Sequence, residues 1–130
     1  MHNDLNDTGK LVLRVTLGIL ILLHGIAKLT NGIAPIQGMV AGMGLPAFTA
    51  YGVYAGEILA PLLLIAGFYA RIGAALIAIN MLVAIALAHA DDVTRLGQTG
   101  GWALELQGMF LFTAIALMLM GPGRFGVNRR

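Results

Sequence analysis

The chain has 130 residues, of which 58% are hydrophobic and only 11% are charged. A typical soluble domain has about 25% charged residues, because a small folded body needs polar side chains to cover its surface. This composition excludes a water-soluble globular domain, and its high hydrophobicity excludes a disordered chain. The absence of cysteine excludes disulfides, thiolate metal sites and thiol chemistry. A formal net charge of +2 is too small to indicate a nucleic-acid partner. The sequence therefore predicts an integral membrane protein.

Four apolar segments are long enough to cross a bilayer, which takes roughly 20 mostly apolar residues in a helix. They cover residues 11–28, 47–68, 72–89 and 102–120. Their apolar residues form no single stripe, as expected of helices that are surrounded by lipid and by one another. The second and third segments are joined by so few residues, about 67–71, that they must form a tight hairpin. We predict one all-α membrane domain, residues 1–130, folded as a four-helix bundle.

The connection between the first two segments also has helical character. Ile36, Met39, Val40 and Met43 recur there at helical spacing. This spacing predicts a short amphipathic helix that lies on the membrane surface.

The basic residues predict the orientation of the bundle. Four crossings place both termini on one side of the membrane. That side then holds most of the basic residues, namely Lys10, Arg14, Arg71, Arg124, Arg129 and Arg130, against Lys28 and Arg95 on the other side. By the positive-inside rule, the N- and C-termini are cytoplasmic. Arg14 lies within the first segment, and we expect it to reach the cytoplasmic headgroups.

Each predicted helix contributes a titratable side chain to the outer half of the membrane. Such side chains cost about 2.5–3.5 kcal/mol each at the centre of a spanning helix, so they usually face the protein interior. The residues concerned are His24, Lys28, Glu57, His89 and Glu105. Asn80 and Gln107 add neutral hydrogen-bonding groups on the last two helices. We predict a common polar site with Glu57 at its base.

Glu57 lies too near mid-membrane to reach the surface easily. We expect it to pair with Lys28 or His24, which are four residues apart and therefore on one face of their helix. Tyr54, three residues before Glu57, is placed to donate a hydrogen bond to it.

The surroundings of Glu57 favour close helix packing. Gly52 and Gly56 form a G-x-x-x-G spacing, which lets a neighbouring helix approach. Pro61 cannot donate a backbone hydrogen bond, and its ring conflicts with the carbonyl of Glu57. We therefore predict a kink that leaves this helix locally adjustable.

Structural interpretations of the same residues stay open. Lys28 can extend to the headgroups, His89 can mark the water boundary, and Glu105 can complement the helix dipole. His24 and His89 could in principle ligate a haem, although structural histidines are commoner. The chain has no Glu-x-x-His pair and no nucleotide, zincin or nucleophile motif, so no metal site and no catalytic residue is predicted.

Several segments are similar to those of a known family. They are residues 24–29 (HGIAKL), 39–46 (MVAGMGLP), 56–59 (GEIL), 66–71 (AGFYAR), 88–89 (AH) and 121–125 (GPGRF). In order and spacing, over nearly the whole chain, they resemble the DoxX family. The resemblance implies a four-helix protein of the cytoplasmic (inner) membrane. Relatives that resemble it include small subunits of quinone-linked redox systems.

The resemblance and the polar cluster together suggest a redox-associated subunit that binds a quinone-type lipid between its helices. Lys28 or His24 would contact a quinone oxygen, and Glu57 would accept or relay its proton. Without a redox centre of its own, such a protein would need a partner redox enzyme or would merely carry the site. Four helices cannot alone form a wide pore, so we expect self-association or a partner protein. The alternative is an assembly or maturation factor, or a small transporter subunit, whose buried polar residues are structural. A third possibility, a proton or small-molecule conduit, lacks a matching polar path toward the cytoplasm.

Overall fold

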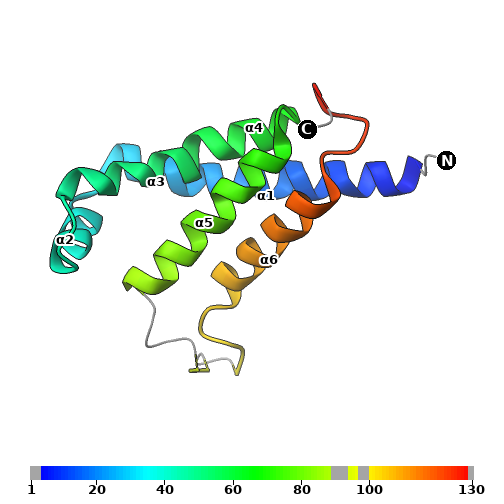
Figure 1. Cartoon of the computed structure of the whole chain (residues 1–130). Helices are drawn as coiled ribbons and strands as arrows, with labels where there is room; N and C mark the ends of the chain where they lie inside the picture. Colours follow the sequence, from blue (N-terminus) through cyan, green and yellow to red (C-terminus); the bar gives the residue numbers. More distant parts are fainter. Residues whose placement is uncertain (1–3, 89–93, 97–99, 129–130) are drawn as a thin grey trace.

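The computed structural model describes residues 4–88, 94–96 and 100–128, and the regular elements in these ranges are all helical. The long helices are α1 (Asp4–Asn31), α5 (Ala70–Ala88) and α6 (Glu105–Met120). Figure 1 shows α5 and α6 side by side and inclined to α1, while the shorter α4 (Ala60–Ala66) runs along α1. The first turns of α1 and the tail after α6 lie at the same end of the bundle (Figure 1). The predicted all-α fold is confirmed for the described residues.

The second predicted helix is not one continuous α-helix. It consists of a 3₁₀ segment (Ala47–Tyr51), the single turn α3 (Gly52–Tyr54), a π-helical segment (Ala55–Leu59) and then α4. Pro61 lies just after the π-helical segment and has no N–H for the carbonyl of Glu57. A π-helical turn is a common local response to a disturbed α-helical ladder. The expected kink therefore takes the form of a change in helical pitch around Glu57.

Among the described residues, one helix is both long and apolar enough to cross a membrane. It is the stretch Leu5–Asn31, in which the 18-residue window has a mean hydropathy of 1.9 and is 28% buried. The apolar stretches Gly56–Ala66, Ala70–Ala86 and Glu105–Met120 are shorter. The last of these begins later than predicted, because Trp102 pairs with Leu96 and its carbonyl accepts the N–H of Glu105 in a turn. By length and composition together, α1 is therefore the one candidate span among the described residues.

The core lies between α1, α4, α5 and α6. Large side chains such as Ile21, Leu64 and Ile77 are fully buried there next to small ones such as Ala74 and Ala114. The small residues let the helix backbones approach, so the large side chains can interdigitate.

The turn between α4 and α5 matches the predicted tight hairpin. Gly67 ends α4 in the left-handed conformation, with φ of 70°. The N–H of Phe68 then donates to the carbonyl of Leu63 at 3.0 Å, which closes the helix end. Tyr69 also has a positive φ, 49°. The hairpin prediction is confirmed.

The short helix in the first connection is confirmed as α2 (Ala34–Gly42). It packs against the bundle through Ile33 and Val40, which form a small cluster with Ala50 and, at its edge, Tyr54. The apolar face of α2, which we expected to lie on the membrane surface, is thus partly used for packing within the protein. Met43 from the same predicted face is 60% exposed.

Arg14 does not extend to a surface, so that expectation is wrong. Its side chain is fully buried, and its guanidinium donates to the carbonyls of Leu64 and Phe125, both at 3.4 Å. Leu64 lies in the last turn of α4, where the helix dipole favours a cation. The tail after α6 folds back over this end and supplies the second carbonyl. Arg14 therefore joins α1, α4 and the tail.

We predict that Arg14→Met loosens the tail. A hydrogen bond from a charged donor contributes about 1.5 kcal/mol, so its loss should speed local amide exchange about tenfold. The amides to monitor are those of Val127 and Asn128, which donate to the carbonyls of Ala66 and Gly67. Hydrogen–deuterium exchange with mass spectrometry provides the measurement.

Arg95→Met removes the same charge at the exposed, opposite end and is the matched control. Equal tail exchange in both variants would show that Arg14 does not anchor the tail.

Candidate functional site

The centre of the candidate site is an ion pair between α1 and the π-helical segment. The Nζ atom of Lys28 donates to both carboxylate oxygens of Glu57, at 2.5 Å and 2.7 Å. The Glu57 side chain is 4% exposed, and that of Lys28 is 28% exposed. A buried carboxylate is costly unless it is paired with a cation and hydrogen-bonded. Of the two partners predicted for Glu57, Lys28 is the one that meets it.

Gly25 brings the two backbones close enough for this pair. A Cβ atom at Gly25 would overlap the carbonyl group of Glu57 and the side chain of Ile58. Only a glycine leaves room for this approach, and Lys28 follows one helical turn later on the same side of α1. The position therefore explains why glycine follows His24 in the sequence.

The Glu57 side also packs closely against α5. A Cβ atom at Gly56 would lie 2.5 Å from the Cβ atom of Asn80. The side chain of Asn80 thus lies over the π-helical segment, directly beside the residue that bears the carboxylate. Gly56 accordingly takes part in helix packing, as its spacing predicts.

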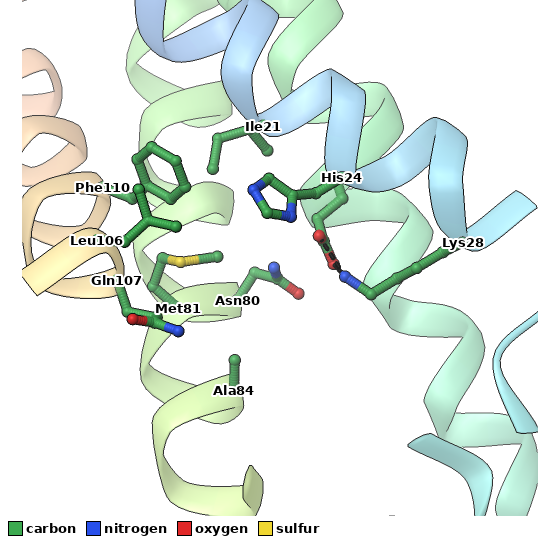
Figure 2. Close-up of a pocket in the computed structure, with 10 residues that line it drawn as sticks. Ile21, His24, Lys28, Asn80, Met81, Ala84, Leu106, Gln107 and Phe110 are labelled. Atoms are coloured by element: carbon green, nitrogen blue, oxygen red, sulfur yellow. Dashed lines mark hydrogen bonds and ion pairs between the residues drawn. The ribbon is translucent and has the colours of Figure 1, made fainter. Parts of the chain in front are cut away.

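A cavity of about 210 Å³ opens beside the ion pair. Its lining comes from α1, the π-helical segment, α5 and α6, and consists of Ile21, His24, Lys28, Glu57, Asn80, Met81, Ala84, Leu106, Gln107 and Phe110. Figure 2 shows polar groups on both sides of this space, with His24 and Lys28 facing Asn80 and Gln107. The pocket therefore combines hydrogen-bonding groups with an apolar floor.

His24 contributes an imidazole to the pocket rather than a partner for Glu57. Its ring meets Phe110 edge to face, with centroids 5.8 Å apart and an interplanar angle of 78°. This contact fixes the ring orientation. Among the described residues, no hydrogen bond engages its nitrogens, so they can serve a ligand.

Three of the predicted site residues lie elsewhere or cannot be placed. The hydroxyl of Tyr54 donates to the carbonyl of Lys28 at 3.4 Å, not to Glu57. Glu105 is exposed at the start of α6, beside Gly101, and does not line the pocket. His89 lies outside the described residues.

The structure also shows where the predicted packing residues Gly52 and Pro61 lie. Gly52 is exposed, and a Cβ atom there would meet no described atom within 4 Å, so the predicted close approach does not involve it. Pro61 is fully buried in the bundle next to Ala60 and Leu64. The helix contact predicted for the G-x-x-x-G spacing thus falls on Gly56, which packs against Asn80 of α5. The close approach of α1 is a separate contact and falls on Gly25.

Asn80 and Gln107, which the sequence indicated only as additional neutral hydrogen-bonding groups, both line the pocket. The sequence feature that points to these two residues is a polar amide side chain within a very apolar helix. In the part of the chain that is described, no group of three His, Asp or Glu side chains could hold a metal ion.

These features define a class: a helical bundle with a buried ion pair beside a small pocket that is polar on two sides. The family model for DoxX matches residues 9–90, and the chain belongs to the DoxX family. A Bacillus subtilis (strain 168) protein named "Putative oxidoreductase CatD" is 31% identical over 115 residues, which cover 88% of this chain and 81% of that protein. The comparison with solved structures gave no match.

We predict that Gly25→Ala destabilises the bundle by about 1–3 kcal/mol, because the new methyl group would overlap the Glu57 backbone. Gly52→Ala is the matched control, and its open surroundings predict a neutral effect or a gain of up to about 1 kcal/mol. Unfolding in detergent, followed by circular dichroism, gives both values. Equal effects of the two substitutions would contradict the close approach of α1 to Glu57.

We predict that replacing Lys28 destabilises the bundle more than replacing Glu57. Lys28→Met leaves a buried carboxylate without a cation and should cost about 3 kcal/mol. Glu57→Gln should cost less, because the amide oxygen still accepts from Lys28 and the lysine can turn outward. The double variant should be more stable than Lys28→Met alone. Strictly additive unfolding free energies would show that the two side chains do not interact.

Proposed function

We propose that this chain is a multi-pass protein of the inner membrane, with both termini in the cytoplasm, that serves as a quinone-linked subunit of a redox system. The family is membrane-associated, and the Bacillus subtilis relative bears the name of an oxidoreductase. The observation that carries the proposal is the pocket beside Lys28 and Glu57, with hydrogen-bonding groups on two sides and an apolar floor.

The surface of the bundle supports placement in a membrane. Large apolar side chains are exposed on its outer helices, including Leu23, Leu82, Met109 and Phe112, each more than half exposed. Exposed apolar side chains in this number are expected on a surface that contacts lipid or a partner protein. In this placement α1 runs outward from its N-terminus, so Lys28 and the pocket lie in the outer half of the membrane.

The size and lining of the pocket favour a ring-sized head group. Its volume of about 210 Å³ is smaller than that of a site for a drug-sized ligand, roughly 300–1,000 Å³. A quinone ring is apolar on its faces and has oxygens at its edge. Its faces would pack against Phe110 and Met81, and its oxygens would meet the polar side chains of the pocket. Its long hydrocarbon tail would remain in the lipid.

Each polar residue has a defined task in this proposal. Lys28 uses two of its three N–H groups on Glu57, which leaves one for a ligand oxygen. Glu57 is nearly inaccessible, so it holds the lysine in place and keeps the pair neutral overall. The amides of Asn80 and Gln107 can donate to a second oxygen across the pocket.

Proton transfer would fall to His24 and to the Lys28–Glu57 pair. When bound, a quinone takes up two electrons and two protons to become the quinol, with the electrons supplied by a partner redox enzyme. The imidazole of His24 lines the pocket, carries no hydrogen bond to the described residues, and is the natural proton donor. This refines the expected role of Glu57, which acts on the ligand through Lys28.

One observation favours the second candidate, an assembly factor or transporter subunit. Lys28 and Glu57 already satisfy each other, so the pair could serve only to fix the register of α1 against the π-helical segment. In that case Glu57→Gln lowers stability and leaves ligand affinity unchanged.

Quinone titration separates the two candidates. We predict that protein purified from native membrane retains a quinone and binds a short-chain analogue saturably, as followed by the fluorescence of Trp102. Glu57→Gln should weaken this binding at least tenfold, because Lys28 loses its fixed position and with it a hydrogen bond from a charged donor. Glu105→Gln, the same change at an exposed position, should bind like the wild type.

Binding that is absent from the wild type, or equal in the two glutamate variants, would contradict the quinone assignment. Thermal unfolding of each variant shows whether it remains folded during the titration.

A further inference from the structure

The tail after α6 has a fixed path across the end of the bundle opposite the pocket. The N–H groups of Val127 and Asn128 donate to the carbonyls of Ala66 and Gly67, both at 3.2 Å. The side-chain oxygen of Asn128 accepts the N–H of Tyr69 at 2.9 Å. The tail is therefore attached to the α4–α5 turn by backbone and side-chain hydrogen bonds.

This path gathers apolar side chains at the end of the bundle, where they remain exposed. Phe125 and Val127 on the tail are 45% and 71% exposed, and Phe68 on the adjoining turn is 41% exposed. Each of these side chains therefore presents apolar surface to its surroundings.

Two arginines lie among these apolar side chains. The guanidinium of Arg124 lies 4.9 Å from the ring centroid of Phe125, and its Nε atom is 4.0 Å from a carboxylate oxygen of Asp7. Arg71 is exposed, and its guanidinium lies against Gly121 at the end of α6. Asp7 is only 8% exposed whereas Arg124 is 38% exposed, so the charge presented outward is positive.

We propose that this terminal patch, formed by Phe68, Arg71, Arg124, Phe125 and Val127, binds the head groups of anionic phospholipids in the cytoplasmic leaflet. The two guanidinium groups contact the lipid phosphate, and the apolar side chains enter the interface between head groups and acyl chains. A free phosphate ion would satisfy the arginines alone, whereas a lipid also covers the three apolar side chains. The proposal rests on placement in a membrane and is independent of the pocket.

Lipid binding to the full-length protein tests this patch. Native mass spectrometry of protein from mixed phosphatidylcholine and phosphatidylglycerol nanodiscs measures which lipid stays bound. We expect a preference for phosphatidylglycerol that falls about fivefold for each arginine lost in Arg71→Gln and Arg124→Gln, because one basic residue near the surface contributes about 1 kcal/mol. Arg95→Gln, at the other end of the bundle, is the matched control and should keep the preference.

Three results would overturn the assignment. They are a wild type that shows no preference, a control variant that loses as much as the arginine variants, or inorganic phosphate that raises the thermal stability in phosphatidylcholine as much as the anionic lipid does. The last would indicate a free-anion site. Quinone affinity should be the same in the arginine variants and the wild type, so failure here is distinguishable from failure of the pocket proposal.

Discussion

The structure depends on one electrostatic constraint: a carboxylate in an apolar bundle must have a cation within hydrogen-bonding distance. Glu57 is almost entirely buried, and Lys28 meets it with two hydrogen bonds. That contact requires α1 to approach the carbonyl of Glu57, and Gly25 leaves the space for it. The pair therefore sets the position of α1 against the π-helical segment.

The pocket follows from the same arrangement. Because the pair is neutral overall, the pocket presents directed donors and acceptors without a large net charge, which suits a neutral ligand with polar edges. The opposite end of the bundle has a different chemistry, with Arg14 buried against carbonyl groups and other arginines exposed. The bundle thus has a polar pocket toward one end and a basic surface at the other. This asymmetry is the one expected if the basic end faces the cytoplasm.

Much of this arrangement could be predicted from the sequence, because insertion energetics restrict where charge can lie. Glu57 lies mid-segment, which predicted a cationic partner on the first helix, either Lys28 or His24. The structure shows that this partner is Lys28. The hairpin and α2 followed from glycine placement and helical spacing. The π-helical segment could not be placed, since Pro61 predicts a disturbance but not which hydrogen-bond pattern replaces the α-helix.

Other features depend on contacts between distant parts of the chain. The burial of Arg14 requires the tail to fold back over α4, and no local pattern near Arg14 indicates this. Tyr54 lies three residues before Glu57, yet the altered pitch between them turns its hydroxyl to the carbonyl of Lys28. Gly25 has no local reason to be glycine, and its role is visible only once the Glu57 backbone lies against it.

The distance between the Lys28 nitrogen and the Glu57 carboxyl carbon in a lipid bilayer is the most direct test of the account. The lysines of this chain are Lys10 and Lys28 and its glutamates are Glu57 and Glu105, so solid-state NMR of labelled protein is readily assigned. If the ion pair is present in the bilayer, nitrogen–oxygen distances of 2.5 and 2.7 Å require a strong nitrogen–carbon dipolar coupling, and this coupling vanishes in Glu57→Gln. A wild-type spectrum without that coupling would contradict the account.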